Sequence, residues 1–547
     1  MSLKSLQVLP RRHLSANRAT ASPLPPAGAS RVPPCERGQG EGPRASRPPL
    51  ASADLSSPPS PRPSPASGRG GRWSRLAFLG LLGAILATPA SAQFNILSAD
   101  EAKRLGKEAH LEAVKEHGGI YEDPNIGGYV ATVGGRLVLA TDNPRAEYNF
   151  SVLDSPILNA FATPGYVHIT RGLLAIFNSE DEMASVLGHE IGHVAAQHVE
   201  ETQSVATVGG IGLSILGAIL GKPELEPLIG LGANLGLAKF SRSNENEADA
   251  LGLRYISRAG YNPRASAMAM ESLEAATNLQ MKLKGAHAPS VIDSFFSTHP
   301  HSPDRVRNLL EQARASGLPL EKPLNREGYL RTIDGMIWGD SSQQGMVRGR
   351  EFIHPELRIA VTFPEGFSIS NKQQAVIATS KSGAAIRVDI AQPKQQPDPL
   401  GYITEEWAAK LRLGNAERIT VNGMAGATAA GRVQSEKGAV DLRLVAVQYE
   451  PQRMFRLLFQ TPTNQTAQLA ESLQRMTYSF RRIDAKQAGA VKPLRVRVVQ
   501  VKSGDTPQTM ANRMRVPQAP LEYFLTMNGL KSGEPLRPGE LVKIVSE

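Results

Sequence analysis

Two histidines and a glutamate of this chain could do chemistry together, because they stand in the pentapeptide His189-Glu190-Ile191-Gly192-His193. Residues four apart lie one turn above the other on the same face of an α-helix, so the two imidazoles can bind one metal ion. Glu190 then stands beside the ion, placed to accept a proton from water. The alternative is a surface helix that happens to carry two histidines. The pattern predicts a zinc site that supports hydrolysis.

A buried helix must hold this pentapeptide, and the flanking residues predict one. Ser179-Glu180-Asp181-Glu182 fits a capping box, in which the Ser179 hydroxyl and the Glu182 carboxylate accept hydrogen bonds from amides at the helix start. Apolar residues then recur at helical spacing on one face, namely Met183, Val186, Leu187, Ile191 and Val194. We therefore expect a buried helix with the pentapeptide in its middle.

A zinc site of this kind needs a third protein ligand, and a second predicted helix offers one. Its apolar residues, at helical spacing, are Ala248, Leu251, Gly252, Tyr255 and Ala259, with Gly260 and Pro263 as the stop. Glu245 and Asp249 share a face of this helix. We predict Glu245 as the third ligand and Asp249 as the residue that holds a ligating histidine through its other ring nitrogen. Glu247 is the nearest competitor, but it points about 200° away from that pair.

These two helices, together with Asn159-Ala160-Phe161-Ala162-Thr163-Pro164-Gly165, resemble the gluzincin zinc metallopeptidase family of HtpX, BepA and the CAAX prenyl proteases. The resemblance covers roughly residues 95–315, and we place the zinc metalloprotease domain at residues 93–317. It implies a mainly α-helical metalloprotease domain with a small β-sheet. It also implies one zinc ion (Zn2+) per chain, bound by the two histidines and Glu245, with Glu190 as the general base.

The resemblance gives roles to residues outside the two helices. Tyr166-Val167-His168-Ile169-Thr170 matches the edge strand against which an extended substrate lies, and its alternation independently predicts a strand. Phe296-Ser297-Thr298-His299-Pro300 matches a loop that places His299 in the open metal position of a self-inhibited state. The alternative for Tyr166–Thr170 is an ordinary sheet edge, and the alternative for the His299 segment is a simple His-Pro turn. His198 also matches a family position. We expect it to pack there or to support a ligand, and we do not expect it to bind the metal itself.

The positive charge of the chain is confined to its first part. The net charge is +10, but residues 1–92 hold 12 Lys+Arg and 3 Asp+Glu, a net of +9, which leaves +1 for the remainder. No basic stripe follows, so nucleic-acid binding is not expected. Residues 1–72 are rich in Pro, Ser and Arg, and we interpret them as a disordered leader or a start placed too far upstream.

Residues 73–92 have the pattern of a signal peptide: a positive start, the apolar run Leu76–Ala87, and Ala90-Ser91-Ala92 as a cleavage site. A transmembrane anchor is the weaker alternative, because spanning needs roughly 20 apolar residues. We expect cleavage after Ala92 and export to the periplasm. The one cysteine, Cys35, lies in the leader, so the mature chain needs no disulfide and no lipid anchor is expected.

One apolar, glycine-rich segment, Val208–Leu220, leaves membrane contact open. It is too short to span a bilayer, so no spanning segment is expected in the mature chain. A buried, closely packed helix pair is the favoured interpretation. The alternative is a patch that touches lipid or a client protein.

A second domain is predicted over residues 357–483, after a linker over residues 318–356. Alternating strands are expected at Leu357–Pro364, Ala384–Ala391, Val440–Tyr449 and Met454–Gln460, with helices near Thr404–Leu413 and Ala467–Met476. Strands with helices set apart argue for an α+β sandwich. The pattern is similar in outline to PsbP-like modules, and no catalytic constellation stands out in it.

Residues 484–494 are predicted to be a linker, and residues 495–547 resemble a small βααβ LysM domain. Thr506 can cap the first helix, with Pro507 at its first position, where the missing amide costs nothing. That proline stands where the family usually has leucine. The resemblance implies peptidoglycan binding, and a protein contact is the alternative.

The chain as a whole predicts an exported zinc endopeptidase that acts on misfolded, unfolded or stalled envelope proteins, tethered near the cell wall. The first alternative is a chaperone-like assembly factor whose zinc site is largely silent. The second is a wall-remodelling factor, which rests on the LysM resemblance alone. The intact Glu190 favours the enzyme.

Overall fold

The computed structural model describes residues 99–198, 240–284, 295–300, 303–394, 398–411, 413–435 and 438–547. The predicted leader, signal peptide and cleavage site, and the apolar segment 208–220, lie outside these residues. The described residues form one compact unit. Within the described ranges, no helix is both long and apolar enough to cross a membrane.

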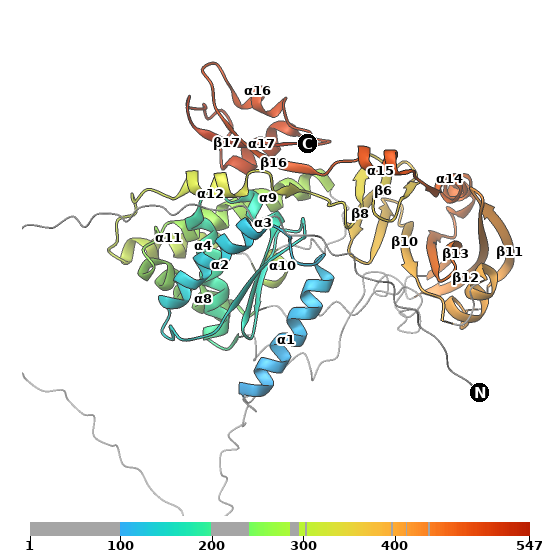
Figure 1. Cartoon of the computed structure of the whole chain (residues 1–547), viewed down its shortest axis with the longest axis horizontal. Coiled ribbons are helices and arrows are strands. Elements are labelled where there is room, and N and C mark those ends of the chain that lie inside the picture. The colour runs from blue at the N-terminus through green and yellow to red at the C-terminus, as the bar shows by residue number, and fades with distance from the viewer. Residues whose placement is uncertain are drawn as a thin grey trace, which may run out of the picture. The chain divides into compact units, whose positions relative to one another are not determined.

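The first part of the described chain packs helices around a small three-stranded sheet (Figure 1). Its elements are α1 (Ala99–Glu116), α2 (Pro124–Leu139), β1 (Asn149–Leu153), β2 (Ala160–Thr163), β3 (Tyr166–Thr170), α3 (Arg171–Ile176), α4 (Glu180–Ala195), α8 (Arg242–Arg258), α9 (Ala265–Lys284), α10 (Phe295–Thr298), α11 (Pro303–Ala315) and α12 (Arg326–Ile333). Helices α2 and α4 pack on one face of the sheet and α1 on the other. A mainly helical domain with a small sheet is the predicted architecture.

The prediction that Tyr166–Thr170 is an edge strand is wrong, because this segment is the central strand of the sheet. The strand order is β1-β3-β2, with β1 parallel and β2 antiparallel to β3. Strands β2 and β3 form a hairpin that turns at Gly165, whose φ of 80° suits glycine. The alternation within β3 correctly indicates a strand, but it carries no information about β1, which pairs on its other side. The strand that ends the sheet beside α4 is therefore β2.

Helix α4 is the predicted helix of the pentapeptide, and its start is capped as expected. The Ser179 hydroxyl accepts from the Glu182 amide, and the Glu182 carboxylate accepts from the Asn178 amide at 3.3 Å. All residues from Glu180 to His193 are buried. The helix lies between the sheet, α8 and α9, so both pentapeptide histidines face other elements of the fold.

Glycines let α4 and α8 cross at close range. A Cβ at Gly252 of α8 would lie 2.8 Å from the backbone nitrogen of His189, and one at Gly192 of α4 would lie 3.0 Å from the Ala248 carbonyl oxygen. Real Cβ atoms essentially never approach a backbone atom to 2.8 Å, so a side chain at position 252 would force the helices apart, and one at position 192 would need a small shift of α8. The close crossing brings the start of α8, with Glu245, to the two histidines.

The residues predicted to be a linker over 318–356 contain ordered structure. Besides α12, they form β4 (Ile337–Trp338), β5 (Met346–Arg348) and β6 (Glu351–His354). Strand β4 joins the sheet of the C-terminal module, and β5 and β6 join the sheet of the second domain. These residues are built into their neighbours and do not form a free connection.

The second domain has helices and antiparallel sheets, as predicted. Its other elements are β7 (Ile359–Thr362), β8 (Phe367–Lys372), β9 (Ala375–Ser380), β10 (Ala385–Ala391), α13 (Pro399–Gly401), the π-helix η2 (Tyr402–Trp407), β11 (Gly414–Val421), β12 (Met424–Ser435), β13 (Gly438–Glu450), β14 (Arg453–Pro462), α14 (Thr466–Ser479) and β15 (Arg481–Arg482). The two sheets have orders β11-β12-β13-β14-β10-β9-β8 and β15-β7-β6-β5. One apolar core joins both sheets and α14, and a second lies under η2.

The C-terminal module has the predicted βααβ order, in β16 (Leu494–Gln500), α16 (Pro507–Ala511), α17 (Pro520–Asn528) and β17 (Leu541–Ser546), preceded by the short helix α15 (Ala485–Ala490). Thr506 caps α16 as expected, accepting from the Thr509 amide, with Pro507 at the first position. The βααβ order alone does not decide whether the module is a LysM domain.

The module packs directly on the first part of the chain. Strand β16 pairs with β4, and Lys543 of β17 donates hydrogen bonds to the carbonyl oxygens of Ala175 and Phe177, where α3 ends. Lys543 is fully buried, and the apolar cores of the two parts are continuous. The module is therefore anchored in the fold of the first domain.

Candidate metal centre

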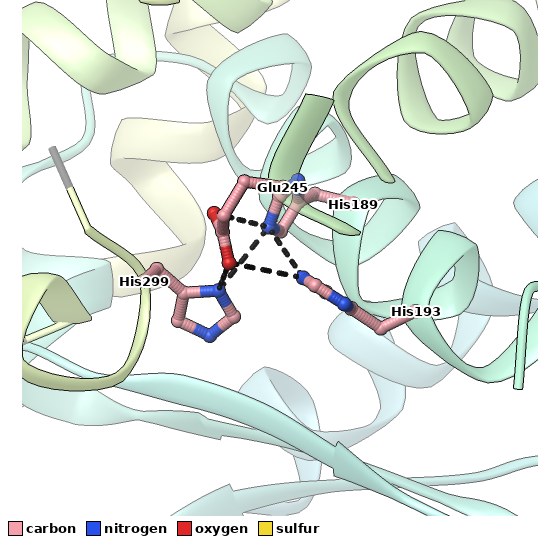
Figure 2. Close-up of side chains that lie close together, drawn as sticks. All are labelled: His189, His193, Glu245 and His299. Atoms are coloured by element: carbon pink, nitrogen blue, oxygen red, sulfur yellow. Dashed lines mark hydrogen bonds and ion pairs between the residues drawn. The ribbon is translucent and has the colours of Figure 1, made fainter. Parts of the chain in front are cut away.

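Four buried side chains converge where α4 and α8 cross. His189 and His193 come from α4, Glu245 from the first turn of α8, and His299 from the residue after α10. One ligand atom of each lies within 4.8 Å of the others. Figure 2 shows the four side chains turned toward one another. The structure thus brings together the three predicted ligands and the predicted inhibitory histidine.

The spacing of these atoms fits a single metal ion. His189 Nε2 lies 3.0 Å from His193 Nε2 and 3.3 Å from His299 Nδ1. Glu245 Oε1 lies 3.5 Å from His193 Nε2 and 3.0 Å from His299 Nδ1. Four ligands on a tetrahedral zinc ion with bonds of 2.0–2.1 Å are about 3.3 Å apart. The mixed imidazole and carboxylate set also suits zinc.

Asp249 and Arg305 support this cluster from behind. Asp249 Oδ1 lies 3.0 Å from Nδ1 of His189, the interaction predicted from the sequence. Arg305 holds both oxygens of Asp249, at 2.8 and 2.9 Å, and its Nη1 lies 2.7 Å from Oε2 of Glu245. The guanidinium therefore balances two buried carboxylates and fixes their orientation. No sequence motif gave Arg305 this role.

A second line of contacts leads outward from His193. Its Nδ1 lies 3.1 Å from Nδ1 of His198, and Nε2 of His198 lies 3.3 Å from Oε2 of Glu247. Glu247 does point away from Glu245, as its helical position predicts, but it contacts the histidine that contacts a ligand. The ring of Phe240 stacks on His193 at a centroid distance of 3.9 Å, which the sequence did not indicate.

Glu190 faces the cluster from α4 and touches strand β2. Its carboxylate accepts a hydrogen bond from the backbone N–H of Ala162. Burial raises the pKa of Glu190, although nearby histidines oppose this shift. A carboxylate with a raised pKa beside a metal cluster is suited to accept and return a proton near neutral pH.

His299 lies between the ligand cluster and Glu190. Its Nδ1 is turned to the ligands, and its Nε2 lies 3.6 Å from Oε1 of Glu190. The ring stacks on Phe295 at 4.2 Å and is fully buried. The imidazole therefore fills the space in front of both the ligands and the carboxylate.

Burial and charge shift the pKa values of the cluster in opposite directions. Burial lowers the pKa of His193 to about 2, so its imidazole stays neutral, the form that binds metals. Burial alone would raise the pKa of Glu245, but hydrogen bonds from His193 and His299 outweigh it, and the net pKa is lowered. Burial is likewise outweighed at Asp249, where contacts with His189 and Arg305 lower the pKa to about 2. Both carboxylates are therefore ionised.

The predicted substrate strand Tyr166–Thr170 does not border the cluster. As the central strand β3 it is covered on both edges, and His168, Ile169 and Thr170 are fully buried. His168 and Tyr166 face α1, where His110 stacks on both rings. The edge strand that reaches Glu190 is β2, so the predicted segment Tyr166–Thr170 lies one strand further from the metal centre.

Comparison with known proteins agrees with the geometry of this centre. Residues 126–313 match peptidase family M48. The chain is 32% identical over 182 residues to a beta-barrel assembly-enhancing protease of Yersinia pestis, covering 31% of this chain and 37% of that protein. It is 30% identical over 225 residues to the mitochondrial metalloendopeptidase OMA1 of Schizosaccharomyces pombe, covering 40% of this chain and 63% of that one. The chain thus covers less than two thirds of each relative's length.

One solved structure is similar to a quarter of the chain. The solution structure of cyanobacterial PsbP (CyanoP) from Synechocystis covers 25% of this chain and 98% of its own, at 13% identity and a TM-score of 0.20. At that TM-score, the PsbP-like identity of residues 357–483 stays a prediction.

Proposed function

Because residues 126–313 match peptidase family M48, we propose that this chain is a zinc-dependent endopeptidase. The observation that carries the proposal is the convergence of His189, His193 and Glu245, at separations that suit one four-coordinate zinc ion, with Glu190 beside them. A surface helix with two chance histidines would bury neither ring nor meet a carboxylate from another helix.

The chain's own residues would supply positioning and proton transfer. When bound, zinc polarises the scissile carbonyl and makes water more acidic. Glu190 would accept the proton of the attacking water and return it to the leaving amine, a task that its raised pKa favours. Asp249 and Arg305 would hold His189 and Glu245 in place, so that the ligands need not reorganise during the reaction.

We propose that the substrate lies along β2 as an extended chain. Strand β2 ends the sheet on the side of α4, and the amide of Ala162 already reaches Glu190. An extended peptide can add to such an edge through backbone hydrogen bonds, which accept many sequences. This role replaces the one that the sequence analysis gave to Tyr166–Thr170.

We propose that the described state is self-inhibited through His299. Its imidazole stands among the ligand atoms and faces Glu190, so a substrate carbonyl and a water molecule would have to displace it. Displacement of the loop that carries His299 would then activate the enzyme.

The natural substrates would be unfolded or misassembled envelope proteins. Two observations support this proposal: the predicted signal peptide, with cleavage after Ala92 and export to the periplasm, and the similarity to proteases named for enhancing β-barrel assembly. Tethering to peptidoglycan through residues 495–547 is a further proposal, supported by their βααβ order.

A second candidate function is a chaperone-like assembly factor with a largely silent zinc site. The buried His299 favours it, because a blocked centre would leave resting proteolysis low. The intact Glu190 and its contact with β2 favour the enzyme.

Cleavage of casein and of an unfolded outer-membrane protein by the Glu190→Gln variant separates the two. The enzyme predicts that Glu190→Gln keeps zinc and thermal stability but loses cleavage, since glutamine cannot accept the proton. Cleavage near the wild-type rate would remove Glu190 from the mechanism, and an unchanged ability to prevent aggregation would support the assembly factor.

A further inference from the structure

A buried histidine connects the metal ligand His193 to a carboxylate at the surface. His198 is 4% exposed, and its two ring nitrogens lie 3.1 Å from His193 Nδ1 and 3.3 Å from Glu247 Oε2. The side chain of Glu247 is 60% exposed. A line of polar contacts therefore leads from solvent on α8 to a ligand on α4.

The backbone turns sharply just before His198. Helix α4 ends at Ala195, and Gln197 then takes a φ of 59°, in the left-handed region that non-glycine residues seldom adopt. This turn carries the next residue, His198, back against His193. Gln197 follows the C-cap Ala196, a position where a left-handed residue commonly ends a helix, and the end of α4 thereby directs His198 toward the ligand.

The positions of the protons follow from binding of the metal through Nε2 of His193. Its Nδ1 then carries the one proton of the neutral ring. Of the two facing Nδ1 atoms, His193 must donate and His198 must accept. The proton of a neutral His198 is left on Nε2, where it faces the acceptor oxygen of Glu247. Every contact along the line then has one donor and one acceptor.

We propose that His198 and Glu247 are positioning residues for His193. His198 orients the ring of His193 through its Nδ1, and Glu247 holds His198 in the tautomer that this hydrogen bond needs. His193 thereby receives support comparable to that which Asp249 gives His189, but through a neutral ring instead of a buried carboxylate. This inference rests on the proposed metal site.

The tautomer of His198 tests the proposal without any substitution. The full chain, labelled with ¹⁵N-histidine and loaded with Zn2+, is measured by long-range ¹H–¹⁵N NMR, which distinguishes the two tautomers. We expect His198 with its proton on Nε2. A proton on Nδ1 in the zinc-loaded chain would overturn the proposal, because His198 could not then accept from His193.

Zinc affinity, measured by competition with a chelator, tests the same proposal energetically. His198→Phe keeps a ring but removes both contacts, and we expect it to weaken zinc binding about 10–100-fold. His198→Asn, whose side-chain oxygen can stand in for Nδ1, should restore most of the loss, and Glu247→Gln should weaken binding by a smaller factor. Glu271→Gln, an exposed acid on α9, is the matched control and should change nothing.

The outcomes separate this inference from the proposed function. If the wild-type chain binds no zinc, the proposed metal site fails. If it binds zinc and His198→Phe binds it equally well, only the positioning role fails. Loss of binding by His198→Phe with rescue by His198→Asn supports the role, because general damage to the fold would not be repaired by asparagine.

Discussion

At the scale of single residues, the candidate metal centre is built from pairs of side chains that lie one turn apart on a helix. The four-residue spacing of His189 and His193 indicated a shared face, and the same rule paired Glu245 with Asp249. The contact between His198 and Glu247 was not predictable from the sequence. It depends on the left-handed backbone of Gln197, which directs His198 toward α8, and no sequence pattern indicates that conformation.

The blocking position of His299 leads to a direct prediction. His299→Ala should raise the rate of casein cleavage several-fold, because alanine leaves room for substrate in front of Glu190. The measurement is the initial rate at equal zinc loading. The double variant His299→Ala with Glu190→Gln is the control and should be inactive. An unchanged rate in the single variant would discard the inhibitory role.

At the scale of elements, helices were predicted more completely than strand neighbours. The caps and apolar spacing of α4 depend on residues within one helix, whereas the place of β3 in its sheet depends on pairing with β1, which precedes the hairpin of β2 and β3. The interpretation of residues 318–356 as a linker missed three short strands: β4 pairs with the distant strand β16, whereas β5 and β6 pair with each other and β6 also pairs with β7.

The glycine crossing of α4 and α8 should matter to both stability and metal binding. Gly252→Ala would place a methyl group 2.8 Å from the backbone of His189, so α8 must shift. We expect a loss of about 1–3 kcal/mol in the free energy of unfolding, together with weaker zinc binding. The measurements are urea unfolding and chelator competition.

Gly135→Ala is the matched control for that substitution. Gly135 lies inside α2, and a Cβ there would meet no atom within 4 Å. Alanine should therefore stabilise the helix by about 0.5–1 kcal/mol. Equal effects of the two substitutions would show that the close crossing is not what requires glycine at 252.

The buried ring of His168 on β3 should make the fold sensitive to acid. Burial lowers its pKa to about 3, with added repulsion from His110 and His117, and neither of its ring nitrogens has a hydrogen-bond partner among the described residues. When the pH is below 6.5, the pKa of this histidine in the unfolded chain, His168 is protonated in the unfolded chain but stays neutral in the folded chain. Stability should therefore fall as the pH falls, by about 1.4 kcal/mol per pH unit between pH 6.5 and 3.

His168→Phe removes this titration while keeping a ring of similar shape. The free energy of unfolding of both chains is measured by urea unfolding at pH 7 and at pH 5. Between these pH values the variant should lose about 2 kcal/mol less stability than the wild type. Groups common to both chains, including the metal ligands, cancel in the comparison. The same pH dependence in both chains would show that His168 is not buried as a neutral ring.

At the scale of the whole molecule, the composition and the hydrophobic pattern of the sequence predicted the division into domains. They did not predict how the domains pack on one another. The βααβ order of the C-terminal module is local, whereas its contacts with β4 and with the end of α3 join segments more than 150 residues apart. The sequence suggested a tether, and the structure shows a module whose core continues that of the first domain.

Lys543 should be central to that attachment. Lys543→Met would remove the donor for the carbonyl oxygens of Ala175 and Phe177 and should cost about 1–3 kcal/mol of unfolding free energy. Lys531→Met, at an exposed lysine of the same module, is the control and should cost far less. If both variants unfold at the same urea concentration, Lys543 does not secure the module to α3.

The metal content of the purified full chain tests the central claim most directly. We predict about one zinc ion per chain for four-coordinate ligation, measured by elemental analysis after removal of loosely bound metal, and loss of that zinc when His189 and His193 are both replaced by alanine. A folded wild-type chain that binds no zinc, or a double variant that still retains it, would contradict the account.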